Sequence, residues 1–164
     1  MKVREQVVIF PDIHFPHEDK KALSCALAVL EYVKPKSFLL LGDFAECEEA
    51  SHWKYQKVKR PRLEDQLKFI DEELELVNKG LDLIDESCKK ARVKYKICTE
   101  GNHEIWLKNL CDEHPYLKKQ YMPKIAFKMN ERGYSYHPYG KYIKIRNSKL
   151  WAYHGGHYNG VNHP

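Results

Sequence analysis

Four short polar clusters in this sequence carry side chains that bind divalent metals in proteins, and each cluster directly follows an apolar run. They are Asp12-Ile13-His14, Gly42-Asp43, Gly101-Asn102-His103-Glu104 and His154-Gly155. Any one of them alone is weak evidence, because Asp and Asn often cap ordinary loops. Together they bring carboxylate, amide and imidazole groups to the ends of successive strands. We therefore predict that they share one metal site.

The types of ligand limit both the choice of metal and the kind of reaction. Carboxylate, amide oxygen and imidazole together suit borderline divalent metals such as Mn, Fe, Zn or Ni better than the all-oxygen sites of Ca. One carboxylate can bridge two cations. Two such ions, about 3.5 to 4 Å apart, can activate water and neutralise a phosphate group. The pattern predicts, in outline, a site for phosphoester hydrolysis.

Three apolar runs, 6–10, 37–41 and 93–98, are too short for helices and are expected to be buried strands. Each leads into one of the polar clusters, and ligands bind at the carboxyl ends of strands in open α/β sheets. A helix is predicted over 20–33, capped by Asp19 and stopped by Pro35. A longer helix over 63–88 has apolar residues at heptad spacing. This fits a coiled-coil seam, but a helix covering a sheet gives the same pattern and is favoured.

The rest of the chain is less regular. A short helix is predicted over 105–110, ending near Pro115, while 115–140 gives no clear pattern. Alternating residues over 141–146 and 149–153 indicate a hairpin that turns at Asn147-Ser148 and leads to His154. With no repeat or linker in the sequence, residues 1–164 are expected to form one domain.

The overall composition excludes several classes of protein. The chain has 164 residues, a net charge of +5 and five cysteines without a Cys-x-x-Cys pair. Neither a disulfide framework nor a closed zinc module is therefore indicated. No apolar run approaches the roughly 20 residues that a membrane span requires, and the first residues lack the apolar core of a signal peptide. We expect a cytoplasmic protein without a membrane partner, and the composition leaves its oligomeric state open.

The ordered set of clusters resembles the calcineurin-like metallophosphoesterases, in particular their compact phage and bacterial members. The resemblance extends over nearly the whole chain. It implies an α/β sandwich of two mixed β-sheets flanked by helices, with two divalent metal ions (Mn, Fe, Zn or Ni) as cofactors. It also implies a phosphatase or phosphodiesterase in which a metal-bound hydroxide attacks phosphorus in line, without a covalent intermediate on the protein.

The same resemblance implies roles for particular residues. Asp12 and His14 would bind the first metal, Asp43 would bridge both, and Asn102 and His154 would bind the second. The implied catalytic residues are His103, Asn102 and Glu46. His103 would act as general acid or stabilise the transition state, because an imidazole can hold or release a proton near neutral pH. Glu46 stands where many members have an Asp that orients this histidine.

The sequence departs from the family pattern at two places. Cys47 replaces an arginine that grips phosphate in the phosphoprotein phosphatase branch, which argues against that branch. The family also ends its motif series with Gly-His-x-His, and none follows His154. We therefore expect a chain truncated before its last strands, with His157 or His163 as less favoured substitute ligands.

Two basic, aromatic stretches, 53–62 and 118–149, leave a second class of function open. They could bind nucleic acid by phosphate contacts and base stacking. The plainer interpretation, solvated lysines and edge-packing tyrosines, is favoured because no nucleic-acid motif accompanies them. The alternative to an enzyme is thus a truncated, non-catalytic fragment with a basic nucleic-acid- or protein-binding surface. For the enzyme, small phosphoesters, nucleotides, nucleic acids and phosphoproteins all remain possible substrates.

Overall fold

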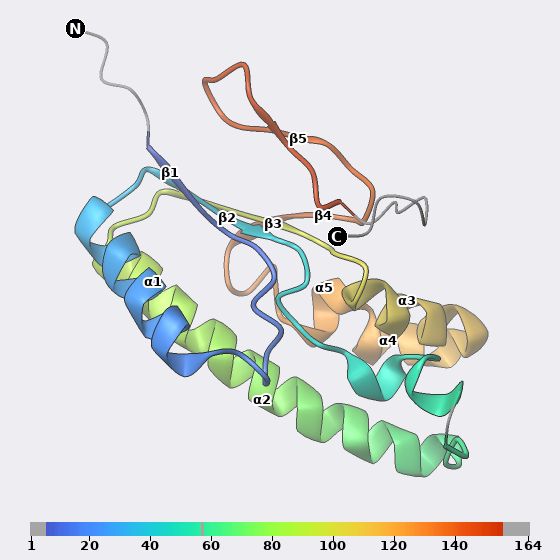
Figure 1. Cartoon of the computed structure of the whole chain (residues 1–164). Coiled ribbons are helices and arrows are strands. Elements are labelled where there is room, and N and C mark those ends of the chain that lie inside the picture. Colours follow the sequence, from blue (N-terminus) through green and yellow to red (C-terminus); the bar gives the residue numbers. More distant parts are fainter. Residues whose placement is uncertain (1–5, 57, 156–164) are drawn as a thin grey trace, which may run out of the picture.

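Four parallel strands form the main sheet of the computed structural model, which describes residues 6–56 and 58–155 (Figure 1). In spatial order they are β1 (Val7–Phe10), β2 (Ser37–Leu41), β3 (Tyr95–Thr99) and β4 (Tyr134–His137). A second, antiparallel sheet pairs β5 (Ile143–Lys144) with β6 (Trp151–Ala152). The expected α/β arrangement of two sheets flanked by helices is confirmed, with each sheet uniform in strand direction over the described residues.

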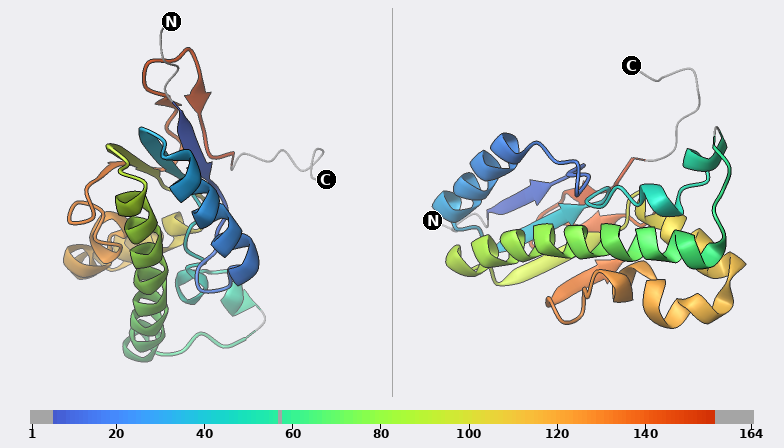
Figure 2. Two further views of the ribbon diagram at one scale, coloured as in Figure 1. Left: turned by 90° about the vertical axis from the view of Figure 1, so that its left-hand side faces the viewer. Right: turned by 90° about the horizontal axis from the view of Figure 1, so that it is seen from below.

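Helices lie on one face of the main sheet and the β5–β6 hairpin lies on the other (Figures 1 and 2). The two long helices below the sheet are α1 (Lys20–Val33) and α2 (Leu63–Lys90). Shorter helices follow β2 and β3: η1 (Glu48–Ala50), η2 (Lys54–Gln56), α3 (Glu104–Glu113), η3 (Pro115–Leu117), α4 (Lys118–Tyr121) and α5 (Pro123–Ala126).

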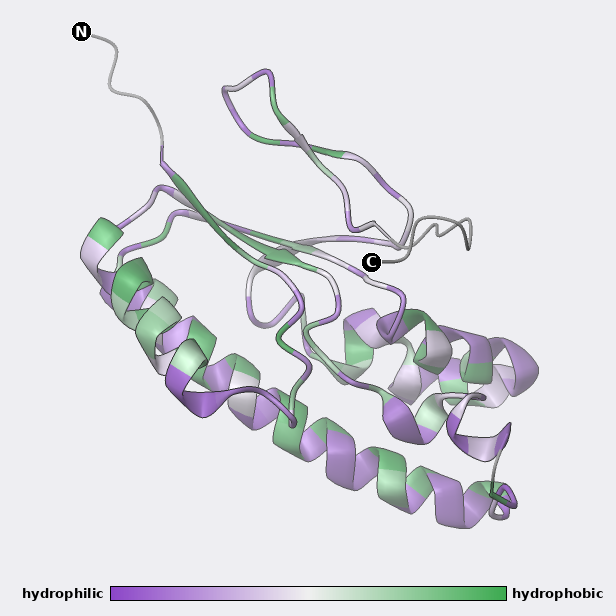
Figure 3. Cartoon of the chain, in the orientation of Figure 1, coloured by the Kyte–Doolittle hydropathy of each residue, from purple (hydrophilic) through white to green (hydrophobic). Residues whose placement is uncertain are grey.

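The alternation of side chains along β2 explains these layers. Phe38 and Leu40 belong to the large core on the helix side, whereas Leu39 packs with Ile145 and Ala152 of the hairpin. Successive strand residues point to opposite faces, and all three β2 residues are fully buried. Figure 3 shows the resulting concentration of apolar residues in the central strands. Burial on both faces is why this strand reads as an unbroken apolar run.

Helix α1 has the predicted bounds, and the Asp19 carboxylate caps it by accepting hydrogen bonds from the Lys21 and Ala22 amides. Most heptad residues of α2, including Ile70, Val77 and Ile84, are buried in the large core, and Leu63, Leu67 and Leu74 pack partly buried against it. Helix α2 therefore covers the sheet, as favoured above, and its apolar seam is not free to form a coiled coil.

The region 115–140, where no regular pattern was found, contains three short helical segments and β4. Strand β4 pairs with β3 from Lys96 opposite Tyr134 to Thr99 opposite His137. Its sequence, Tyr-Ser-Tyr-His, lacks the aliphatic residues that identified the other strands. None of the helices among the described residues is long and apolar enough to cross a membrane.

Gly80 lies inside α2, which runs unbroken through it. Its role is in packing, since a Cβ atom placed there would lie 2.5 Å from two ring carbons of Phe15. Phe15 is 1% exposed and belongs to the loop that carries Asp12 and His14. Its amide donates to Phe44 O and its carbonyl accepts from the Glu46 amide. Gly80 thus lets α2 support that loop directly.

We predict that Gly80→Ala destabilises the chain by about 1–3 kcal/mol, because a methyl group would overpack the buried ring of Phe15. The loss should outweigh the roughly 1 kcal/mol that alanine gains over glycine in a helix. Urea unfolding measures the difference. Lys79→Ala, at an exposed neighbouring position, is the control and should change stability by less than about 0.5 kcal/mol. An unchanged or increased stability of Gly80→Ala would refute this role.

Candidate metal centre

The loops at the carboxyl ends of β1 and β2 remain paired beyond the strands. The Asp12 amide donates to Gly42 O at 3.2 Å, and the His14 amide donates to Asp43 O at 3.0 Å. The β3 loop contributes Asn102 and His103, and the chain leaving β6 contributes His154. All five predicted metal ligands therefore lie at one end of the structure, as the sequence led us to expect.

Three of these residues have an unusual backbone conformation. Asp12, His14 and Asp43 have φ angles of 51°, 56° and 47°. Positive φ is uncommon in residues other than glycine. Strained conformations of this kind persist only where the surroundings enforce them, and they cluster at functional sites. Here the strain aims consecutive ligands of the β1 and β2 loops at a common point.

A first ligand group consists of Asp12, His14 and Asp43. One potential donor atom from each lies within 4.8 Å of the others. Asp12 is exposed, whereas Asp43 is only 5% exposed. The group is therefore open to solvent on one side and anchored in the protein on the other. Two carboxylates and an imidazole fit a borderline divalent metal.

A second group consists of Asp43, Asn102 and His154. His154 Nδ1 donates to Leu41 O at 2.8 Å, which turns Nε2 toward Asn102 Oδ1 at 3.1 Å and Asp43 Oδ2 at 3.3 Å. Ligands bound about 2.0–2.2 Å from one ion are themselves separated by roughly 3 Å. The spacing and types of these donor atoms therefore also fit a divalent metal.

The same contacts couple Asp43 and His154 electrostatically. The hydrogen bond with Asp43 raises the pKa of His154 to about 9. Burial acts to raise the pKa of Asp43, but hydrogen bonds from His154 and from the His103 amide outweigh it and lower that pKa. Asp43 is therefore held as a carboxylate, the form that binds cations.

Gly42 and Gly101 are required by close approach. A Cβ atom on Gly42, where φ is +72°, would lie 2.6 Å from the His154 ring. A Cβ atom on Gly101 would collide with the side chain and amide of Asp43. The two glycines of the sequence motifs thus leave room for the ligands.

Glu104, the first residue of α3, joins the β2 and β3 loops. Its Oε2 accepts from the amides of Asp43 at 3.0 Å and Gly101 at 2.6 Å, and its Oε1 accepts from the Ala45 amide at 2.9 Å. The side chain is completely buried. Burial raises the pKa of Glu104 to about 8, although the three amide donors oppose the rise.

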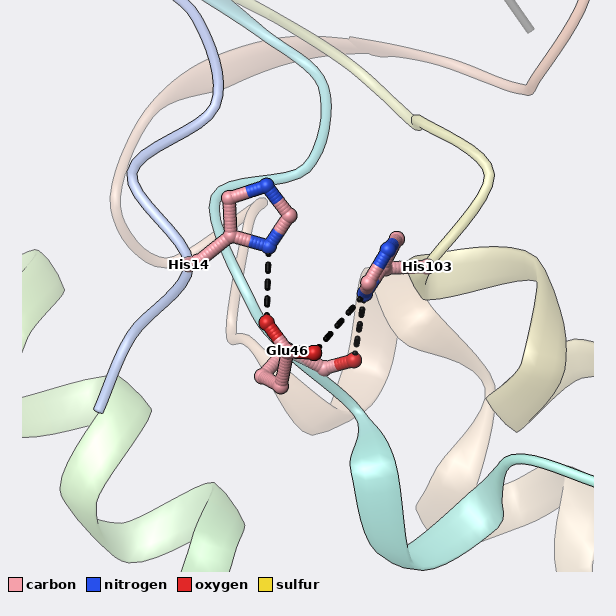
Figure 4. A group of neighbouring side chains, drawn as sticks. All are labelled: His14, Glu46 and His103. Carbon is pink, nitrogen blue, oxygen red and sulfur yellow. Dashed lines mark hydrogen bonds and ion pairs between the residues drawn. The ribbon is translucent and has the colours of Figure 1, made fainter. Parts of the chain in front are cut away.

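Glu46 lies between two imidazoles (Figure 4). His14 Nδ1 donates to Glu46 Oε2 at 2.7 Å, whereas His103 Nδ1 donates to the Glu46 backbone carbonyl at 2.8 Å. The carboxylate is also 3.5 Å from His103 Nδ1. The sequence linked Glu46 with His103 alone, so its shorter side-chain contact with His14 is an addition. The three residues also form a third potential ligand group, with donor atoms within 4.8 Å of one another.

The substitute ligands suggested by the sequence, His157 and His163, lie outside the described residues. Among residues 6–56 and 58–155, the three groups above are those in which ligand side chains converge at the predicted site.

We predict that Glu104→Gln destabilises the chain by about 1–3 kcal/mol. The amide has one acceptor oxygen, so its NH2 group would face a backbone N–H and leave it unsatisfied in a buried place. The separated loops should also bind Mn more weakly, as measured by calorimetry alongside urea unfolding. Glu113→Gln, an exposed carboxylate in the same helix, is the matched control. Equal stability and Mn affinity in wild type and Glu104→Gln would contradict this account.

One of three comparisons with known proteins identifies a family. A search of curated proteins and a search of solved structures each returned no match. The model of the calcineurin-like phosphoesterase family matches residues 6–163, which include every predicted ligand. The chain is therefore a member of the calcineurin-like phosphoesterase family.

Proposed function

We propose that this chain hydrolyses phosphoesters with two divalent metal ions that share Asp43. Family membership indicates metal-dependent phosphoester hydrolysis. The observation that carries the finer proposal is that two ligand groups meet at Asp43. Its carboxylate groups with Asp12 and His14, and it also contacts His154 beside Asn102. A carboxylate that belongs to both ligand groups is placed to bridge two metal ions.

Bound at these positions, two divalent ions would neutralise the charge of the phosphate group and lower the pKa of water. Asp12 and His14 would hold one ion, and Asn102 and His154 the other. Glu46 would orient His14, because a carboxylate that accepts from Nδ1 fixes the tautomer and leaves Nε2 as the ligand atom. Manganese is the first metal to test, since the donor set does not distinguish among Mn, Fe, Zn and Ni.

His103 is proposed as the general acid. Its Nδ1 is occupied by the Glu46 carbonyl, so Nε2 is the atom that can give a proton to the leaving-group oxygen. Its ring centroid is 4.7 Å from that of His14, which places it beside the first ligand group. Asn102, its neighbour in the β3 loop, would help to position the phosphate through the second ion.

Two further proposals concern the chain as a whole. All five cysteines are free in the structure, which supports a cytoplasmic location, where thiols stay reduced. We also propose that residues 1–164 form one domain. Family membership implies that the substrate is a phosphoester.

We predict that His103→Ala lowers kcat for phosphomonoesters by about 10²–10⁴-fold without changing metal content. The loss should be greater for phenyl phosphate than for p-nitrophenyl phosphate, because the better leaving group needs less protonation. Steady-state kinetics with Mn and elemental analysis measure the two effects.

Asp43→Asn is the contrasting variant and should lose both turnover and bound metal, because it removes the shared carboxylate. Loss of metal in His103→Ala would refute its role as an acid. Wild-type turnover in Asp43→Asn would refute the site, and an inactive, metal-free wild type would favour the non-catalytic alternative.

A further inference from the structure

A row of aromatic side chains leads away from His103 along α3. The Trp106 ring, one helical turn beyond His103, lies 4.2 Å from the imidazole centroid to centroid. On its other side Trp106 lines a cavity of about 160 Å³ together with His52, Arg60 and Asn109. The segment that follows β2 therefore runs beside α3, as Figure 1 also shows. Trp106 therefore contacts the proposed general acid and also lines the cavity that His52 and Arg60 share.

The outer end of the row is an exposed tryptophan. The Trp53 ring is 4.5 Å from the His52 ring, and Trp53 is 59% exposed. Behind it, Arg60 lies over the Tyr55 ring at 5.6 Å. Trp53 thus presents a large planar surface that the core does not use. A tryptophan next to a cationic group is a platform on which nucleobases stack.

The charged side chains of this segment are all positive. Residues 51–62 include five lysines and arginines and no acidic residue. Lys54 is paired with Glu48 and Glu49, and Arg60 lies 3.8 Å from Glu113. Lys59 and Arg62 are exposed and have no ion pair within the described part of the chain. Two free cations beside an exposed aromatic ring suit a polyanion that also carries planar groups.

Sequence alone favoured the plainer interpretation of this stretch, solvated lysines around packed aromatic rings. The structure adds two observations against it. Trp53 is not packed into the core, and its neighbour His52 lines the same cavity as Trp106, whose ring contacts the proposed catalytic imidazole. Exposed single aromatic residues are common on proteins, but this one is linked to His103 through His52, the cavity and Trp106.

We propose that residues 51–56 and 58–62, together with Trp106, bind single-stranded nucleic acid, so that the substrate is a phosphodiester of a nucleic-acid strand. This inference rests on the function proposed above. Water supplies the oxygen that bonds to phosphorus and releases a proton to solvent. The P–O bond to the leaving nucleoside breaks, and His103 gives its proton to the leaving nucleoside oxygen. The leaving strand then lies along α3, where Trp53 stacks on a base and Lys59 and Arg62 contact phosphates.

The first test is binding of a fluorescein-labelled single-stranded 15-mer to the full chain in EDTA, followed by anisotropy. Trp53→Ala should weaken binding about tenfold, within the range measured for loss of one stacked base. Trp53→Phe should restore most of the affinity. Lys59→Gln and Arg62→Gln should each reduce the slope of log affinity against log salt by about 0.7. Tyr32→Ala, an 88% exposed residue at the far end of α1, is the matched control and should bind as wild type.

The second test compares turnover of the same oligonucleotide with that of bis(p-nitrophenyl) phosphate in Mn. Trp53→Ala should raise KM for the oligonucleotide about tenfold more than KM for the small diester. If wild type hydrolyses the small diester but Trp53→Ala changes neither oligonucleotide binding nor its KM, the inference is overturned and the proposed function stands. Preferred turnover of a phosphoserine peptide would overturn it as well. If no ester is turned over but binding depends on Trp53, the proposed function fails and the nucleic-acid surface is supported.

Discussion

The candidate site depends on one buried carboxyl group that holds two loops together. Glu104 accepts hydrogen bonds from the backbone amides of Asp43, Ala45 and Gly101, and so fixes the β2 loop against the β3 loop. Removing an acceptor from buried donors costs about 1–3 kcal/mol for each unsatisfied group. The His103 amide adds a direct link between the same loops by donating to Asp43 Oδ1 at 2.9 Å. The close packing of Gly101 against Asp43 is possible only because the loops are drawn together in this way.

The remaining predicted ligands, Asp12, His14 and His154, are positioned by elements other than the β2 and β3 loops. The β1 loop pairs with the β2 loop and is backed by Phe15, whose ring fills the space left by Gly80 of α2. The hairpin on the opposite face brings His154 to Leu41 and Asp43. Helices and hairpin therefore converge on the same strand end from both sides of the sheet. This explains how strained residues such as Asp12 and His14 are kept in place.

Much of this arrangement was predictable from local sequence. The apolar run of β2, the helix α1 with its Asp19 cap, and the ligand clusters at strand ends are all signalled within a few residues. Strand β4 was missed because its polar residues are held in the sheet by pairing with β3, which no local pattern records. The contact between Glu46 and His14 and the cavity that His52 shares with Trp106 of α3 were missed for the same reason, since each depends on residues distant in sequence.

The central claim is that Asp43 serves two metal positions, and anomalous diffraction from crystals of the Mn-loaded chain tests it most directly. The account predicts two Mn peaks about 3.5 to 4 Å apart. One should lie among Asp12, His14 and Asp43, and the other among Asp43, Asn102 and His154. A single peak among His14, Glu46 and His103, the third ligand group, would contradict it.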